Sequence, residues 1–291
     1  MRLHAEHGPA IRRSVGRHTS ARDVRPTAAL IGYGAVGRRV ARLIVDGAAG
    51  PASLVAVLVR DPERYADAAA ALGIPFVADA ASLVAARPDV ILEAGGHEAF
   101  RQHVPAILRS GIDVISISVG ALADPALLAE VEGSAAAGGA RLRIPSGAIA
   151  ALDAISSAGV GTLERVVHTV RKPPRTLLDG TEADEVLASG EARVLYYGPA
   201  REATRLFPAN VNVVAAVSLA GIGLDRTVAR VIADPAVSRN THEVEAVGDF
   251  GRLSVRIENI PTNDNPKTGR IVAFSLVRAL RALSERVVVG A

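Results

Sequence analysis

Residues 28–37 read AALIGYGAVG, an apolar run that leads directly into three closely spaced glycines. Gly32, Gly34 and Gly37 form the pattern G-x-G-x-x-G at the point where a strand is expected to give way to a helix. In such a turn the first glycine permits the tight bend, the second lets the backbone approach a pyrophosphate, and the third allows close helix–strand packing. The stretch therefore predicts a dinucleotide-binding turn, with a purely structural turn as the alternative.

The segment after the glycines, residues 36–45, has the composition of a helix. The first N–H groups of a helix have no partner within it and bind phosphate readily. Ala35 and Val36 therefore join the three glycines as candidate cofactor-binding residues.

The end of the second apolar run, residues 54–59, bears on the choice of cofactor. An NAD-specific enzyme usually has Asp or Glu there to hold the ribose hydroxyls, whereas this chain has Arg60. A guanidinium at that position would pair with the 2′-phosphate of NADP, with Arg38 as a second candidate. The alternative is that Arg60 stacks on adenine or faces water. Both NAD and NADP are therefore expected as cofactors.

The first half of the chain alternates short apolar runs with helical segments. Further strands are expected at residues 90–92, 114–117 and 142–144. Asp61-Pro62 and Asp124-Pro125 are typical helix starts, and Gly73 and Gly138-Gly139 are typical helix ends. This alternation predicts an α/β Rossmann domain with a doubly wound parallel sheet.

After Ile144 the pattern becomes β-rich, with one helix at 213–219 and a last helix at 268–283 that is expected to return to the first domain. The strands are expected at residues 162–170, 193–197, 228–232, 241–247 and 253–260. Short connections between the last three strands indicate an α+β domain with a mostly antiparallel sheet. The predicted organisation is a disordered basic tail (1–26), a Rossmann domain (27–145 with 267–291) and a substrate-binding catalytic domain (146–266).

Composition excludes several classes of protein. A chain of 291 residues with 49% hydrophobic content can bury the cores of two domains. No apolar run approaches the roughly 20 residues that span a bilayer, so no membrane partner is expected. Cysteine is absent, which removes disulfides, thiolate metal sites and the thioester-forming dehydrogenases, and fits a reducing cytoplasm. No metal site is expected.

The net charge of +3 comes from the tail. Residues 1–26 hold six arginines against two acidic residues, so the rest of the chain carries a slight negative charge. Basicity confined to a tail does not predict a nucleic-acid partner.

Lysine and asparagine are scarce, and both are concentrated in the second half. The only lysines are Lys172 and Lys267, and all six asparagines lie between residues 210 and 265. Arg171 and Lys172 end an expected strand, and Lys267 precedes the last helix. We interpret these three cations as candidates for binding an anionic substrate, with solvated loops as the alternative.

Histidine suits proton transfer near neutral pH, and four of the seven histidines lie outside the tail. His97 and His103 flank an expected helix, where His97 could reach the cofactor. His168 alternates with valines and is interpreted as a packed, hydrogen-bonded histidine. His242 lies on the inward face near the start of a strand. This placement suits a cleft, although a satisfied core histidine is the alternative.

In the order and content of its sequence motifs, the chain resembles the L-aspartate dehydrogenases from about residue 28 to residue 283. The matching stretches are IGYGAVG (31–37), EAGGHEAFRQHV (93–104), SVGAL (118–122), IPSGAIAALDA (144–154), HTVRKPP (168–174), REATRLFPANVNVVAAVSLAGIGLD (201–225), IADP (232–235), NTHEVEAVGDFG (240–251) and NPKTG (265–269). The family often has serine where this chain has Gly269, and we expect little effect from this difference.

The resemblance implies an activity and three site residues. The enzyme would oxidise L-aspartate to iminoaspartate with NAD or NADP, reversibly, and the imine would hydrolyse to oxaloacetate and ammonium. By resemblance, His242 is the catalytic histidine, and Ala148 and Asn212 contact the cofactor. A homodimer and a role in pyridine nucleotide biosynthesis are expected on the same ground.

Two other functions stay open. A related oxidoreductase of the homoserine dehydrogenase or dihydrodipicolinate reductase-like group would use the same cofactor domain on another amino acid or imine. A sensor would bind NAD(P) without turnover, but it has no need for so polar a second domain.

Overall fold

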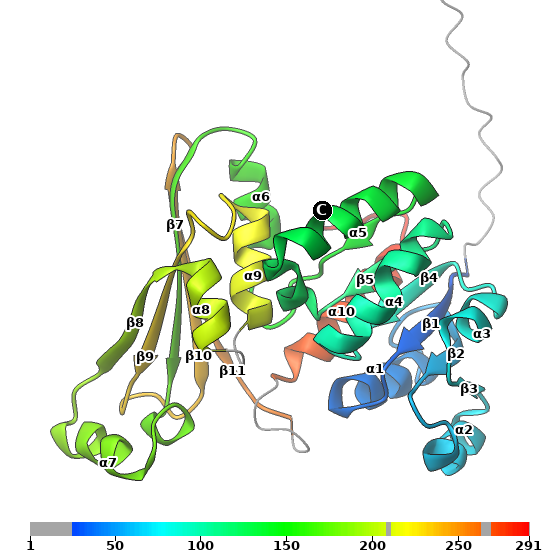
Figure 1. Ribbon diagram of the computed structural model, residues 1–291, viewed down its shortest axis with the longest axis horizontal. Coiled ribbons are helices and arrows are strands. Elements are labelled where there is room, and N and C mark those ends of the chain that lie inside the picture. Colours follow the sequence, from blue (N-terminus) through cyan, green and yellow to red (C-terminus); the bar gives the residue numbers. More distant parts are fainter. Residues whose placement is uncertain (1–24, 208–210, 263–268, 291) are drawn as a thin grey trace, which may run out of the picture.

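The protein has two β-sheets side by side, each covered by helices (Figure 1). The computed structural model describes residues 25–207, 211–262 and 269–290. The predicted disordered tail (1–26) lies almost wholly outside the described residues, and Lys267 lies outside them too. Among the described residues, no helix is long and apolar enough to cross a membrane.

The first sheet is parallel and has the strand order β3-β2-β1-β4-β5-β6. Its strands are β1 (Thr27–Ile31), β2 (Ser53–Leu58), β3 (Phe76–Val77), β4 (Val90–Glu93), β5 (Asp113–Ser116) and β6 (Leu142–Arg143). The strands run outward in both directions from β1 and β4, so the predicted doubly wound Rossmann sheet is confirmed. In such sheets ligands bind outside the carboxyl ends of the strands where the order reverses.

Helices cover both faces of this sheet. They are α1 (Ala35–Val45), α2 (Ala66–Leu72), α3 (Ala80–Ala85), α4 (His97–Arg109), α5 (Pro125–Gly138) and α10 (Ile271–Ala282), with 3-10 helices η1 (Glu63–Tyr65) and η2 (Val119–Ala123). One face packs on α1 and α10, and the other packs on α3, α4 and α5. The last helix therefore lies beside α1, far from it in sequence (Figure 1).

The second sheet has the order β11-β10-β7-β9-β8. Its strands are β7 (Leu163–Lys172), β8 (Arg193–Pro199), β9 (Val228–Ala233), β10 (Asn240–Gly248) and β11 (Gly251–Asn259). All neighbouring pairs are antiparallel except β7 and β9, which confirms a mostly antiparallel sheet. The other elements here are α6 (Leu152–Ala158), η3 (Pro174–Thr176), α7 (Gly180–Ser189), α8 (Ala200–Leu206) and α9 (Val211–Ala220).

The structure differs from the sequence prediction in its short elements. The helix expected directly at Pro62 begins only at Ala66, because Pro62 precedes the 3-10 turn η1 instead. Helices α7 and α8 were not predicted from the sequence, because they have few periodic apolar positions. Gly73 ends α2 in the left-handed conformation and Pro125 opens α5, both as predicted.

The glycine turn is held by close backbone contacts. Gly32 has φ +91°, and a side chain there would come within 2.5 Å of the Cα of Gly95 in the turn after β4. A side chain on Gly37 would overlap the carbonyl oxygen of Gly32. A side chain on Gly34 would meet nothing within 4 Å. Gly32 and Gly37 are therefore required by the fold, whereas Gly34 faces open space.

A matched pair of substitutions separates these roles. Alanine normally stabilises a helix relative to glycine, but Gly37→Ala forces a methyl group into backbone and should lower the free energy of unfolding by about 1–3 kcal/mol. A side chain on Gly34 meets nothing within 4 Å, so Gly34→Ala should cost only the N-cap preference for glycine over alanine, up to about 1 kcal/mol. Thermal unfolding of both variants measures the difference, and equal melting temperatures would contradict the packing role of Gly37.

Candidate active site

A cavity of about 280 Å³ lies where the carboxyl ends of the parallel strands meet the second sheet. The first domain contributes Val36 and the turns after β4, β5 and β6, and the second contributes α9 and the start of β10. Three of the predicted site residues from the second half, Ala148, Asn212 and His242, all line it. The tertiary structure thus brings Val36, which follows Gly34 in the glycine turn, and these distant residues into one site, whereas the three glycines do not line the cavity.

The glycine turn fits a dinucleotide. Helix α1 begins after Gly34 with no side-chain cap and no acidic residue in its first turn. Its first N–H groups, including those of Ala35 and Val36, are therefore available to an anion, and the helix dipole favours negative charge there. The open space beside Gly34 provides the close approach that a pyrophosphate needs.

An aromatic cluster lies at the outer side of this turn. Tyr33 packs edge-on against Tyr65 and Phe76, with ring centroids 5.5 Å and 4.8 Å away. Burial raises the pKa of Tyr33, and the nearby charge of Arg38 opposes this shift. Arg60 follows β2 and is exposed, at the position where a 2′-phosphate is expected.

A buried carboxyl group links two segments that line the cavity. Glu93 ends β4 and is 0% exposed. One oxygen accepts from the Ser118 hydroxyl (2.9 Å) and from the backbone N–H groups of Gly95 (2.7 Å) and Gly96 (3.1 Å), and the other accepts from the Ser116 hydroxyl. Burial raises the pKa of Glu93, and the hydrogen bonds from these four donors oppose the rise. Glu93 therefore joins the turn after β4 to the turn after β5.

Asn212, in the first turn of α9, joins the two domains. Its Oδ1 accepts from the backbone N–H of Gly120 in η2 and lies 2.8 Å from both that nitrogen and Nε2 of His97. Gly120 has no room for a side chain, which would overlap Val211. With both contacts on Oδ1, the amide Nδ2 is left as the donor of Asn212 toward the cavity. His97 thus contacts a cavity residue from the start of α4.

The segment around Ala148 is held from two sides. The Ala148 carbonyl accepts from Nδ2 of Asn259 at 3.0 Å, and the N–H of Gly147 donates to the Ser275 hydroxyl at 3.1 Å. Asn259 ends β11 and Ser275 belongs to α10. Ala148 can therefore offer only backbone and a methyl group to a ligand, from a fixed position.

His242 is 1% exposed on β10, and its Nδ1 lies 3.0 Å from Nε2 of His168 on β7. The rings are nearly parallel, at 17°. Since Nδ1 is engaged, Nε2 is the ring nitrogen of His242 left for the cavity. Burial lowers the pKa of His242 well below its usual value, and the neighbouring His168 and Lys172 lower it further. His242 is therefore neutral near pH 7. His168 is a buried, hydrogen-bonded histidine, as the sequence suggested.

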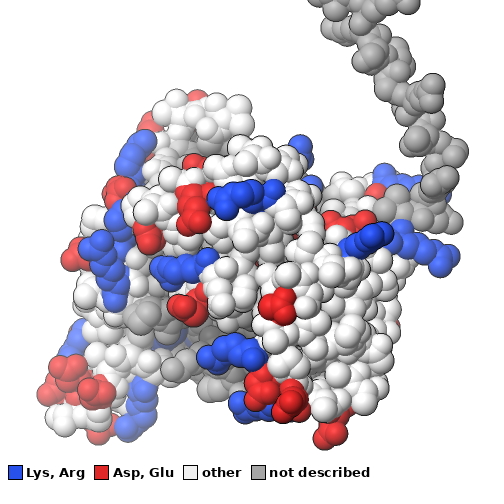
Figure 2. Space-filling view, turned by 45° about the vertical axis from the view of Figure 1, so that its right-hand side comes forward, with Lys and Arg blue, Asp and Glu red and all other residues white. Residues whose placement is uncertain are grey.

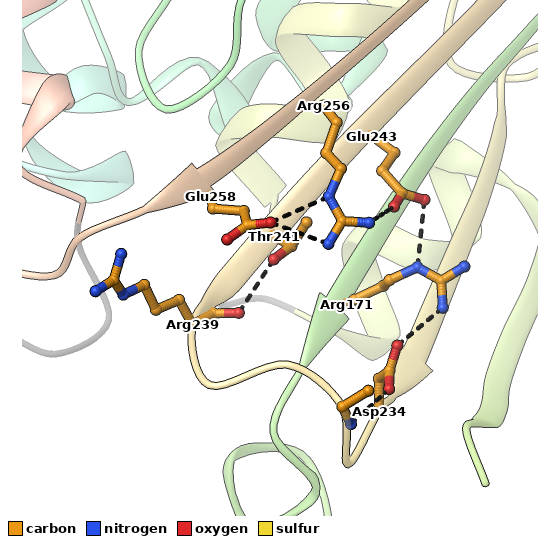
Figure 3. Close-up of polar contacts among 8 residues, drawn as sticks. Arg171, Asp234, Arg239, Thr241, Glu243, Arg256 and Glu258 are labelled. Atoms are coloured by element: carbon orange, nitrogen blue, oxygen red, sulfur yellow. Dashed lines mark hydrogen bonds and ion pairs between the residues drawn. The ribbon is translucent and has the colours of Figure 1, made fainter.

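Arg171 and Lys172 do not act together, because successive residues of a strand point to opposite faces. Arg171 lies on the face away from His242, where it contacts Asp234 at 3.0 Å and Glu243 at 3.3 Å (Figure 3). Burial disfavours its charge, but these two carboxylates raise its pKa overall. The structure therefore gives Arg171 a place in an ion-pair network and not in the cavity.

Lys172 lies on the same face of β7 as His168 and is 7% exposed. It is close enough to His242 for its charge to lower the pKa of that imidazole. A buried cation near the cavity fits the predicted role in binding an anionic substrate.

Sequence reasoning did not single out Glu93, Asn240 and Asn259 as site residues. Asn240 lines the cavity, and its Oδ1 is buried without a hydrogen-bond partner among the described residues. The confinement of asparagine to the second half was a signal for Asn240 and Asn259. A carboxylate directly after the apolar run at 90–92 was the signal for Glu93.

Neither the distribution of surface charge nor the metal-binding side chains of the described residues identify a further site. On the face shown in Figure 2, basic and acidic side chains are interspersed over both halves of the molecule. Within residues 25–207, 211–262 and 269–290, no group of three or more His, Cys, Asp or Glu side chains could hold a metal ion.

Comparison with known proteins covers both domains. Residues 32–145 match the family model described as homoserine dehydrogenase, NAD binding domain, and residues 153–283 match aspartate dehydrogenase, C-terminal. The L-aspartate dehydrogenase of Cupriavidus necator is 41% identical over 86% of this chain and 95% of its own. That of Pseudomonas aeruginosa is 43% identical with the same coverage.

Solved structures agree with these matches. The crystal structure of aspartate dehydrogenase from Thermotoga maritima has a TM-score of 0.72 and 25% identity, and covers 92% of this chain and 100% of that one. A homoserine dehydrogenase from Thiobacillus denitrificans shares the fold, with a TM-score of 0.59 and 15% identity, over 90% of this chain and 73% of its own.

The parallel sheet with its glycine turn and the matching N-terminal family place this chain among the NAD-binding dehydrogenases. Because the second sheet and the whole-chain comparisons agree, the assignment goes further. The chain belongs to the L-aspartate dehydrogenase family.

The histidine pair predicts a pH-dependent stability. Burial lowers the pKa of His168 to about 4, whereas in the unfolded chain it titrates near 6.5. Between these values the unfolded state binds more protons, so the free energy of unfolding should fall as the pH drops from 6.5 toward 4. The loss from His168 alone is on the order of 3 kcal/mol.

Urea unfolding between pH 7 and 4.5 measures this slope. His168→Gln removes one titrating group, so its free energy of unfolding should depend less on pH than that of the wild type over the same range. Parallel curves for the two proteins would contradict a neutral buried His168.

Proposed function

We propose that this protein catalyses the reversible NAD(P)-dependent oxidation of L-aspartate to iminoaspartate, which hydrolyses to oxaloacetate and ammonium. The observation that carries the proposal is the position of His242. It lies in the cavity that joins the glycine turn to the second sheet, with one ring nitrogen left for a ligand. Membership of the L-aspartate dehydrogenase family supports L-aspartate as the substrate.

The cofactor would be held along the carboxyl edge of the first sheet. Gly32, Gly34, Ala35, Val36 and Gly37 would bind the pyrophosphate through backbone groups. Farther along the cavity, the Asn212 amide and the Ala148 backbone would bind the nicotinamide end. Bound NAD(P) supplies the acceptor for the hydride that leaves C2 of aspartate.

His242 would carry the proton chemistry. The ammonium group of aspartate must lose a proton before its nitrogen lone pair can form the C=N bond. His242 is neutral near pH 7, so its free ring nitrogen can accept that proton. In the reverse direction the same nitrogen returns the proton to the amine. In both directions, therefore, the imidazole of His242 alternates between its neutral form and its singly protonated form.

Aspartate carries two carboxylates, and cations are needed to bind them. We propose Lys172, buried near His242, for one of them, and Lys267, which lies outside the described residues, for the other. Asn240, whose Oδ1 has no hydrogen-bond partner among the described residues, would accept from the substrate ammonium group. Its burial without a partner costs free energy that a bound donor would recover.

The activity is tested by following NAD(P)H formation with L-aspartate, and its loss with oxaloacetate plus ammonium. His242→Ala should lower kcat by about 10²–10⁴-fold, because it removes a general base, while the Kd for NAD(P) stays near that of the wild type. Unchanged turnover would refute the role of His242.

The substrate class is tested in parallel with a panel of amino acids. L-Homoserine and L-glutamate are suitable controls, since one lacks the second carboxylate and the other places it one carbon farther away. Turnover of another amino acid in preference to L-aspartate would favour the wider homoserine dehydrogenase-like group. Cofactor binding without turnover of any substrate would favour a sensor.

Arg60 is proposed to admit NADP through its 2′-phosphate. Removing one charge-assisted hydrogen bond should raise the KM for NADP in Arg60→Ala by about tenfold or more, with little change for NAD. Steady-state kinetics with both cofactors measures the two values. Equal effects would mean that Arg60 acts on the shared adenosine moiety or not at all.

We also propose a cytoplasmic homodimer that acts on small molecules, with neither nucleic acid nor membrane as a partner. The absence of cysteine supports a reducing compartment, and family membership supports the dimer and a place in pyridine nucleotide biosynthesis.

A further inference from the structure

The proposed reaction leaves His168 without a role, although within the described residues it is the side chain that hydrogen-bonds to His242. We propose that His168 is a positioning residue. It accepts a hydrogen bond from Nδ1–H of His242 and so holds that imidazole in the tautomer whose free lone pair, on Nε2, faces the cavity. This inference rests on the proposed function, because it assigns His242 to proton transfer.

The register of the second sheet brings the two rings together. His242 lies opposite Val170, and His168 lies opposite Val244, so the histidines are diagonal neighbours on one face of adjacent strands. The Nε2–Nδ1 distance of 3.0 Å and the 17° angle between the rings fit one hydrogen bond.

The surroundings leave the pair few other partners. His168 is 2% exposed, and its neighbours on this face, Val166, Val170 and Val244, are buried hydrophobic residues. Valine side chains can neither donate to nor accept from an imidazole. Among the described residues, the side chain that hydrogen-bonds to each ring on this face is therefore the other ring.

Only one proton arrangement suits a base at the cavity. A lone pair on Nε2 of His242 requires the proton on Nδ1, and a neutral imidazole has only one. That proton must then point to Nε2 of His168, which accepts, while the proton of His168 lies on its own Nδ1. When His242 takes up a second proton on Nε2, its Nδ1–H still donates to the same acceptor. The bond therefore serves both charge states without rearrangement.

Burial of both rings keeps them neutral near pH 7. Lys172 lies near His242 on the same face, and the carboxyl group of Glu93 is held by Ser116 and Ser118, which line the cavity. Because burial lowers the pKa of both imidazoles, His168 is available as an acceptor. His168 thus orients His242 through the hydrogen bond between the two rings.

A pair of variants tests the inference. His168→Leu removes the acceptor, so Nδ1–H of His242 would be buried without a partner and the other tautomer would be favoured. Its kcat should fall about ten- to hundredfold with little change in the Kd for NAD(P). His168→Gln offers an amide oxygen near the position of Nε2, and it should restore most of the loss.

The tautomer itself can be read without turnover. In ¹⁵N-histidine NMR spectra of the cofactor-free protein, assigned by comparison with His242→Ala, wild-type His242 should carry its proton on Nδ1. His168→Leu should move it to Nε2, and His168→Gln should leave it on Nδ1. A merely structural role for His168 would not move this signal.

The outcomes separate this inference from the proposed function. A wild-type protein that shows no hydride transfer with L-aspartate would refute the function, while the NMR spectra would still report the tautomer. A wild-type His242 protonated on Nε2 would overturn the inference even if His168→Leu fails to fold. So would full kcat in His168→Leu alongside an inactive His242→Ala.

Discussion

The site depends on the contact between Asn212 and the turn after β5. The cavity lies between the two sheets, and its shape depends on the packing of α9 against η2, where Ala216 of α9 also joins the core of the first domain. One amide oxygen accepts from the backbone of Gly120 and contacts His97, so three elements meet at a single atom. Each such bond contributes only about 0.5–1.5 kcal/mol, but a mismatch would leave buried polar groups unpaired. The contact therefore selects one arrangement of the domains more than it adds stability.

The hydrogen-bond partners of the buried polar groups near the cavity determine what each group can do. Glu93 is removed from water, which disfavours its charge, and four donors from two turns offset that cost. His242 is equally buried and has one neutral partner. These two environments have opposite consequences. The carboxylate is tied into the backbone and holds the shape of the site, whereas the imidazole keeps one nitrogen free and can change its charge.

Much of the fold could be predicted because its signals are local. The glycine pattern at 32–37 and the alternation of apolar runs with helices determine the Rossmann sheet by short-range geometry. The face of His242 followed from the two-residue period of a strand. The same rule, applied to Arg171 and Lys172, would have separated these two cations before the structure was known. Short helices such as α7 were missed because few periodic apolar positions mark them.

By itself, the sequence determined the glycine turn, the two types of sheet, the inward face of His242 and, through resemblance, the family and the likeness of Ala148 and Asn212 to cofactor contacts. Only the tertiary structure decided which residues meet. The partnership of His168 with His242 depends on the register of β7 against β10, and the contact of Asn212 with Gly120 spans 92 positions of sequence. Such pairings arise from packing between distant segments, and no local pattern encodes the distance between two strands or two domains.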